Sequence, residues 1–132
     1  MTRDQKRLKI LIVDDSPAVT DILSQLCEFL GHDVLCAEDG RQGLAVIRSG
    51  THIDLVFTDY NMPIMDGVEM ARRIKAVHPT LPVVLITGSA GVTDSGPELE
   101  VFDAVVQKPF ELKAFAECID RFFPGSTLPI ED

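Results

Sequence analysis

The sequence predicts an α/β fold in which helices cover both faces of a five-stranded parallel sheet. Short apolar runs alternate five times with segments whose apolar residues recur at helical spacing. The runs are continuous in Val, Ile and Leu, as in strands that are buried on both faces. Strands that alternate with helices in this way pair in parallel through right-handed crossovers, and a doubly wound sheet is the simplest such arrangement.

The first two strands are expected at residues 8–13 and Asp33–Ala37. Between them, Ser16 is suited to cap a helix, and Pro17 can occupy its first position because no N–H is needed there. Gly31 ends this helix. The apolar residues that we expect on its buried face are Val19, Ile22, Leu23, Leu26, Phe29 and Leu30.

The middle of the chain continues the alternation. A weaker helix is expected at residues 41–48, and a third strand at residues 53–58 leads directly to Asp59. Asp66 is suited to cap a third helix. The fourth strand covers residues 82–87, so both of these strands end at or next to a polar residue.

The last third of the chain departs from the regular pattern. The fifth strand is expected at Ala104–Gln107 and the last helix at residues 111–123. Between the fourth and fifth strands, residues 88–100 contain three glycines and a proline, which disfavour a regular helix. The complete pattern predicts a flavodoxin-like (βα)5 sandwich with strand order 2-1-3-4-5 and an atypical fourth helix.

The length of 132 residues suits a single domain. We expect this domain at residues 8–123, after a charged lead-in at residues 1–7 and before a tail or linker stub at residues 124–132. Twelve basic against 21 acidic side chains give a net charge of −9, which argues against binding to nucleic acid or anionic membranes. The longest apolar runs, of about six residues, are much shorter than the roughly 20 that span a bilayer.

The cysteines and histidines give no sign of a metal site. Cys27, Cys36 and Cys118 lack CxxC spacing and lie in apolar segments, so we expect reduced core residues of a cytoplasmic protein. No histidine has a partner at ligand spacing. The three that we expect at the surface are His32, His52 and His78.

Polar side chains stand where the expected strands end. Asp14 and Asp15 follow the first strand, Asp59 the third, Thr87 closes the fourth, and Lys108 follows the fifth. Because the carboxyl ends of parallel strands meet at one edge of the sheet, these residues converge. Neighbouring carboxylates repel one another unless a cation joins them, and oxygen ligands of this kind suit Mg²⁺. Together these groups are suited to transfer of a phosphoryl group onto an aspartate.

Four short motifs occur in a fixed order along the chain. They are VDDS at 13–16, TDYNMPIMDG at 58–67, VLITG at 84–88 and KPF at 108–110. Each motif alone is weak, but the set resembles the receiver domain of two-component response regulators over nearly the whole chain.

The resemblance implies a role for each residue. Asp59 would be the phosphoacceptor, Asp15 a direct Mg²⁺ ligand, Asp14 a ligand through water, and Asn61 a ligand through its backbone carbonyl. Lys108 would pair with Asp59 before phosphorylation and with the phosphoryl group afterwards. Mn²⁺ would be a substitute for Mg²⁺.

The resemblance also implies partners and a switch. Thr87 would bond the phosphoryl group through its hydroxyl, and Pro109 occupies a position where the family usually has a cis peptide. The phosphoryl source would be a sensor histidine kinase or a His-containing phosphotransfer protein, and the output protein or domain is left open. Nucleic acid and membrane are not expected partners, whether the chain is free-standing or part of a longer protein.

Three departures from the family pattern fall on the face formed by the fourth helix, the fifth strand and the fifth helix. Val105 stands where the family usually has Tyr or Phe, residues 88–100 disfavour a helix, and Phe102 and Asp103 replace a small pair. Most relatives use this face for dimerisation or output, so the chemistry is complete while the usual relay is altered. Gly88, smaller than the usual alanine, predicts a short-lived aspartyl phosphate.

Two other classes of function are weaker alternatives. A receiver-like interaction module that signals without phosphorylation is favoured by Val105 and opposed by the complete acidic set. A phosphohydrolase with an aspartate nucleophile would carry a second acid two residues later, where this chain has Asn61. P-loop and GxGxxG patterns are absent from the sequence. We therefore expect no enzyme beyond self-phosphorylation and self-dephosphorylation.

Overall fold

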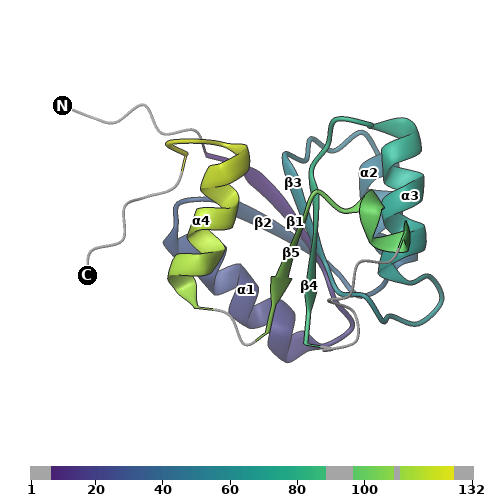
Figure 1. The fold of residues 1–132 in the computed structure, drawn as a ribbon, viewed down its shortest axis with the longest axis horizontal. Helices are drawn as coiled ribbons and strands as arrows, with labels where there is room; N and C mark the ends of the chain where they lie inside the picture. The colour runs from purple at the N-terminus through teal and green to yellow at the C-terminus, as the bar shows by residue number, and fades with distance from the viewer. Residues whose placement is uncertain (1–6, 89–96, 109–110, 127–132) are drawn as a thin grey trace.

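A computed structural model describes residues 7–88, 97–108 and 111–126 of the chain. Five parallel strands form one sheet in the order β2-β1-β3-β4-β5, which confirms the predicted topology (Figure 1). Their bounds lie within two residues of the predicted ones. The strands are β1 Lys9–Val13, β2 Asp33–Ala37, β3 Leu55–Thr58, β4 Val83–Thr87 and β5 Ala104–Gln107.

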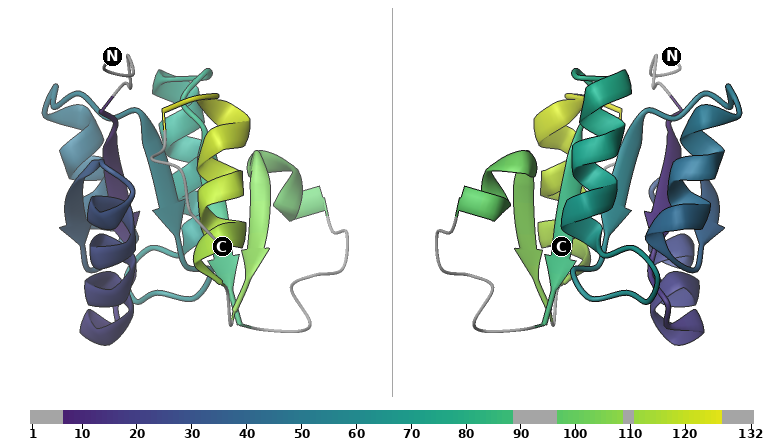
Figure 2. Two further views of the ribbon diagram at one scale, coloured as in Figure 1. Left: turned by 90° about the vertical axis from the view of Figure 1, so that its left-hand side faces the viewer. Right: turned by 90° about the vertical axis from the view of Figure 1, so that its right-hand side faces the viewer.

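Helices cover both faces of the sheet. Helices α1 and α4 lie on one face, and α2 and α3 lie on the other (Figure 2). In the described part of the chain, the 3₁₀ helix η2 takes the place of a fourth helix between β4 and β5, as the atypical composition predicted. The bounds are α1 Pro17–Phe29, α2 Gly40–Arg48, α3 Gly67–Val77, η2 Pro97–Val101 and α4 Leu112–Phe122.

Alternate residues of each strand build two apolar layers. In β1, Ile10 and Ile12 face the layer shared with α1 and α4, whereas Leu11 and Val13 face the layer shared with α2 and α3. Nearly complete burial on both faces is why β1, β3 and β4 read as continuous apolar runs. None of the helices in the described part of the chain is long and apolar enough to cross a membrane.

Side-chain caps begin the first three helices. The Ser16 hydroxyl accepts a hydrogen bond from Val19 N at 3.4 Å, and Asp66 Oδ1 accepts one from Glu69 N at 2.8 Å. Both caps were predicted, because short oxygen-bearing side chains satisfy the free N–H groups of a first turn. Asp39 caps α2 in the same way.

The predicted face of α1 is too wide. Ile22 is 55% exposed and Phe29 is 63% exposed, because the sheet contacts only a narrow stripe that includes Leu23 and Cys27. Cys36 is also exposed, so the prediction of a core residue is wrong for this cysteine. It lies on β2, which is an edge strand and therefore has fewer neighbours.

The predicted surface position is also wrong for His32. Its side chain is buried, and Nδ1 accepts a hydrogen bond from Leu8 N at 3.1 Å. Burial, with a smaller effect of Arg7, lowers the pKa of this imidazole from its ordinary value, so the neutral form is favoured. His52 and His78 are exposed, as predicted.

Candidate functional site

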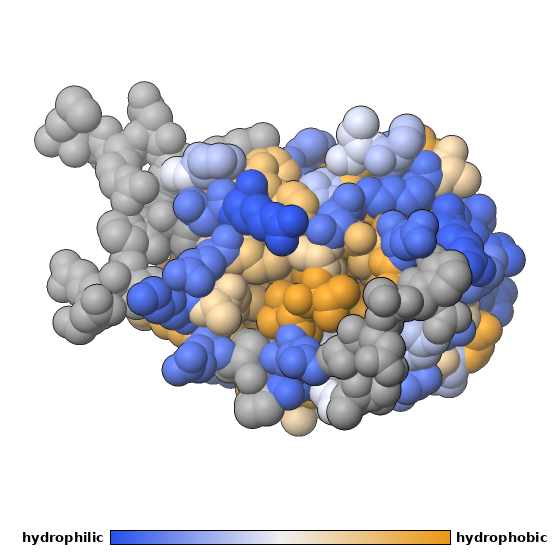
Figure 3. Space-filling view, viewed as in Figure 1, coloured by the Kyte–Doolittle hydropathy of each residue, from blue (hydrophilic) through white to orange (hydrophobic). Residues whose placement is uncertain are grey.

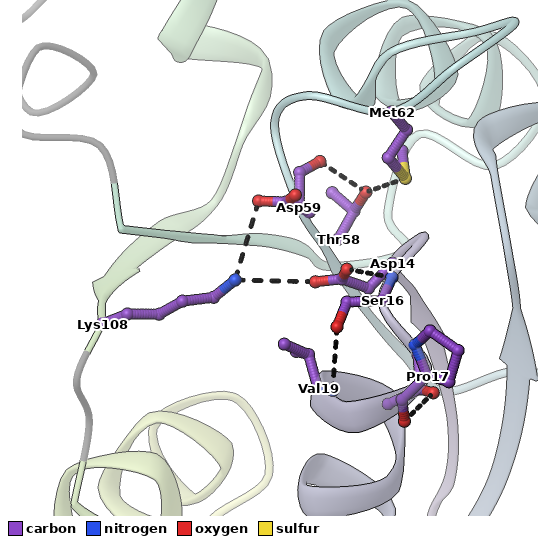
Figure 4. Close-up of polar contacts among 9 residues, drawn as sticks. Asp14, Ser16, Pro17, Val19, Thr58, Asp59, Met62 and Lys108 are labelled. Atoms are coloured by element: carbon purple, nitrogen blue, oxygen red, sulfur yellow. Dashed lines mark hydrogen bonds and ion pairs between the residues drawn. The ribbon is translucent and has the colours of Figure 1, made fainter.

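The carboxyl ends of β1 and β3 place two aspartates side by side. Asp14 N donates to Ala37 O at 3.1 Å, and Asp59 N donates to Val13 O at 3.0 Å. These bonds continue the ladders of the sheet by one residue, so both acids stand on well-defined backbone. The close-up in Figure 4 shows the carboxylates of both turned toward the amino group of Lys108.

Three carboxylates form one cluster at this edge. Asp14, Asp15 and Asp59 each offer an oxygen within 4.8 Å of those of the other two. Asp14 is 4% exposed, Asp59 is half-buried and Asp15 is exposed, so the cluster opens to solvent on one side. Carboxylate oxygens on an open rim fit Mg²⁺, which keeps several waters and takes few protein ligands.

Among the described residues, Lys108 carries the positive charge that lies nearest to the cluster. Its Nζ lies 3.6 Å from Asp14 Oδ2 and 3.9 Å from Asp59 Oδ1. Charge-assisted hydrogen bonds are shorter, at about 2.7–2.9 Å, so the ammonium lies between the two acids without closing on either. The lysine is held by its backbone, because Lys108 N donates to Thr87 O at 2.8 Å.

The electrostatics of the cluster favour added positive charge. Burial raises the pKa of the Asp59 carboxyl above its ordinary value, and the negative charges of Asp14 and Asp15 raise it further. The positive charge of Lys108 and the backbone N–H of Tyr60 act in the opposite direction and do not cancel the rise. A cation or a loss of negative charge at this position would therefore stabilise the fold.

Thr87, Asn61 and Gly88 are the other predicted residues in the described part of the chain. Thr87 is buried at the end of β4, next to the strand that leads to Lys108. Asn61 is exposed in the loop between β3 and α3. Gly88 is exposed, and a Cβ built on it would lie 3.6 Å from Lys108 Cβ and Cδ, an ordinary contact. Pro109 lies outside the described residues.

Gly67 has a part in the site that the sequence analysis missed. Gly67 N donates to Tyr60 O at 3.0 Å. A Cβ at this position would collide with the carbonyl oxygen of Asp59. The start of α3 therefore lies directly against the backbone of Asp59, and glycine permits that approach.

Val105 occupies the position of the missing aromatic residue. It is 42% exposed on β5, three residues before Lys108. Figure 3 shows apolar surface in the middle of the molecular face on which this strand lies. Among the described residues between β4 and β5, residues 97–101 form the 3₁₀ helix η2.

Comparison with known sequences identifies the family. The family model described as "Response regulator receiver domain" matches residues 10–120. The gliding motility regulatory protein of Myxococcus xanthus is 35% identical over 120 residues, which cover 88% of this chain and 15% of that protein. The probable transcriptional regulator ycf27 of Galdieria sulphuraria is 35% identical over 132 residues, covering 93% of this chain and 51% of that protein.

Solved structures agree with the sequence comparison. The response regulator TrrA of Thermotoga maritima, in complex with Mg²⁺ and BeF, matches with a TM-score of 0.82 and 28% identity. The match covers 88% of this chain and 99% of that one. The chain spans between 12% and 51% of the length of the curated relatives it matches. The fold, the motifs and the family match together show that this chain belongs to the receiver domains of two-component response regulators.

Proposed function

We propose that this receiver is a phosphoacceptor, with Asp59 taking a phosphoryl group from a phosphohistidine on a histidine kinase or a phosphotransfer protein. The observation that supports this most strongly is the convergence of Asp14, Asp15, Asp59 and Lys108 at one edge of the sheet. Residues 8–123 would form the domain, acting in the cytoplasm without direct contact to nucleic acid or membrane. Phosphorylation would change its contacts with an output protein or domain.

The transfer itself is a displacement at phosphorus. A carboxylate oxygen of Asp59 forms a bond to phosphorus as the bond from phosphorus to the donor imidazole breaks, and the bond's electron pair leaves with the imidazole. Asp59 must be ionised for this step. The burial that raises its pKa also keeps the carboxylate poorly solvated and therefore ready to react.

Asp14, Asp15, Asp59 and the Asn61 carbonyl would hold Mg²⁺, with Mn²⁺ as a substitute. When bound, the cation supplies charge neutralisation for the phosphoryl oxygens. Lys108 adds a second positive charge, 3.9 Å from Asp59 Oδ1. Thr87 would donate its hydroxyl to a phosphoryl oxygen and so couple β4 to the phosphorylated state.

The direct test is a mass measurement. The chain is incubated with acetyl phosphate and Mg²⁺, beside an Asp59→Asn control and a sample with chelator. We expect a gain of one phosphoryl group in the wild type that needs Mg²⁺ and is absent from the variant. An equal gain in Asp59→Asn would place the acceptor elsewhere.

A receiver-like module that signals without phosphorylation is the second candidate. It is favoured by the exposed Val105 and by η2 in place of a fourth helix. Beryllofluoride, which mimics a phosphoryl group on an aspartate, separates the two. If wild-type protein takes neither a phosphoryl group nor beryllofluoride while it binds Mg²⁺, the second candidate replaces the first.

A further inference from the structure

Three arginines line one groove between α2 and α3. Arg41 and Arg48 come from α2, and Arg73 comes from α3. Leu44 and Met65 form apolar parts of the same groove. The groove therefore combines a cationic rim with an apolar floor on the face of the sheet opposite α1 and α4 (Figure 1).

The spacing of Arg41 and Arg48 places both along one side of α2. Arg41 and Arg48 are seven residues apart, so they lie on the same side of α2, separated by about two turns or roughly 10 Å. Helix α2 carries no acidic residue. Within the described ranges of the chain, neither arginine forms an ion pair, and both side chains are exposed.

Arg73 forms one ion pair, but its guanidinium has further N–H donors. Its Nε donates to Glu69 Oε2 at 2.7 Å, which orients the guanidinium on the surface of α3. A guanidinium has five N–H donors in a planar fork, so other donors are still available to a carboxylate. An isolated exposed pair of this kind is also readily exchanged for another partner.

The acidic charge of the chain outside the groove disfavours a long polyanion as its partner. Twelve basic residues stand against 21 acidic ones over the whole sequence, so a basic groove is a local exception on an acidic molecule. A long polyanion such as nucleic acid would meet the acidic surface around the groove. Screening limits the reach of exposed charges to roughly 8 Å at physiological salt, so a short acidic segment can bind the groove without that repulsion.

The groove also adjoins the segment that carries Asp59. Met65, which lines the groove, belongs to the loop from Asp59 to α3, and Met65 O accepts a hydrogen bond from Gly40 N at 3.3 Å. This contact ties the loop to the first residue of α2. A partner in the groove therefore contacts the loop that leaves the candidate site, on a face that does not involve Val105.

We propose that this groove binds an acidic segment of a protein partner. Carboxylates of the segment would pair with Arg41, Arg48 and Arg73, and an apolar side chain between them would pack on Leu44 and Met65. Arginine suits this role because its planar fork matches a carboxylate. The proposal does not require phosphoryl transfer, so its test is independent of the test of the acceptor.

The test uses fluorescence anisotropy with a labelled helical peptide that carries Glu, Leu and Glu along one face. Its control peptide has Gln at both Glu positions. The protein variants are Arg41→Gln/Arg48→Gln and a matched control, Arg121→Gln. Arg121 is, like Arg48, an exposed basic residue in the last turn of a helix, but it lies on α4.

We expect the acidic peptide to bind the wild type and Arg121→Gln equally. The double variant should bind it about tenfold more weakly, because two charge-assisted contacts are lost. The Gln peptide should bind all three proteins weakly. Thermal unfolding at the same temperature in all three would establish that the variants are folded.

Three results would overturn the proposal. The first is no difference between the acidic and the Gln peptide on the wild type. The second is an equal loss of affinity in Arg121→Gln, which would indicate a general charge effect. The third is displacement of the acidic peptide by a short DNA duplex at lower concentration than by unlabelled peptide, which would assign the groove to nucleic acid.

Discussion

The two ends of the parallel sheet use aspartates in opposite ways. At the amino ends, the buried Asp54 and the more exposed Asp103 each accept a hydrogen bond from the first N–H of a strand. Asp54 Oδ2 accepts from Lys9 N at 2.9 Å, and Asp103 Oδ2 accepts from Val83 N at 2.8 Å. Asp103 also pairs with Lys75 Nζ at 2.7 Å. These side chains are fully used in holding the fold together.

At the carboxyl ends, the carboxylates are crowded and incompletely paired. Asp14 and Asp59 share Lys108 at 3.6 and 3.9 Å, and Asp15 adds a third negative charge. The comparison teaches that residue type alone does not indicate a site. What distinguishes the end with the candidate site is incompletely paired carboxylate charge that the rest of the fold tolerates.

Asp54→Ala should give the largest stability change of the set. Alanine leaves Lys9 N without its carboxylate acceptor in a partly buried position, and the contact with His52 is lost as well. We expect the free energy of unfolding in urea to fall by about 2 kcal/mol. Phosphoryl uptake by the folded protein should be unchanged.

His52→Ala is the matched control for this substitution. Its side chain is 78% exposed, so loss of its contact with Asp54 should cost less than about 0.5 kcal/mol. A cost as large as that of Asp54→Ala would mean that the histidine contact, and not the strand N–H, dominates.

Asp59→Asn should change the free energy of unfolding in the opposite direction. The pKa of this carboxyl is raised mainly by burial, so its ionised form opposes folding at neutral pH. Removing the charge should raise the free energy of unfolding by about 1 kcal/mol in the absence of Mg²⁺. Adding Mg²⁺ should stabilise the wild type more than the variant. Destabilisation by Asp59→Asn would contradict the contrast between the two ends.

The buried His32, at the amino end of the sheet, should make the free energy of unfolding depend on pH. The folded-state pKa of His32 is lowered, so its contribution is fully present above the unfolded value of about 6.5 and is lost as pH falls below it. Between pH 8 and pH 6 we expect a decrease of less than about 1 kcal/mol. In His32→Asn this decrease should be smaller, as measured by urea unfolding at both pH values.

Gly88→Ala should have the smallest effect, and only at the carboxyl end. The added Cβ fits at 3.6 Å from Lys108, so the fold should be unaffected. A methyl group beside the site should restrict water, and we expect the aspartyl phosphate to last about threefold longer. The half-life is followed by intact mass after removal of donor. An unchanged half-life would exclude Gly88 as a determinant of lifetime.

Much of the fold was predictable because local signals agree with the tertiary structure. The helix caps at Ser16 and Asp66 and the apolar strands are encoded within a few residues each. Right-handed crossovers left few topologies, and the simplest of these, the doubly wound flavodoxin-like sheet, has the observed strand order. The acids of the site were predictable because they directly follow strands, and parallel topology alone brings such positions together.

Other features depend on contacts between distant segments and were not predictable. The burial of His32 depends on Leu8 N, 24 residues earlier in the chain. The exposure of Phe29 depends on how much of α1 the sheet covers. The requirement for Gly67 depends on the position of the Asp59 carbonyl. Each needs coordinates, because no local pattern distinguishes it from a turn or a helix face.

The position of β5 at the edge of the sheet has a consequence for hydrogen exchange. Every residue of β3 is buried, whereas β5 alternates between half-buried and exposed residues and pairs with β4 alone in the described sheet. Backbone amides of β5 should therefore exchange through local opening, and those of β3 only through global unfolding. Lys108 thus stands on the part of the site that opens first, while the Asp59 backbone stays in register.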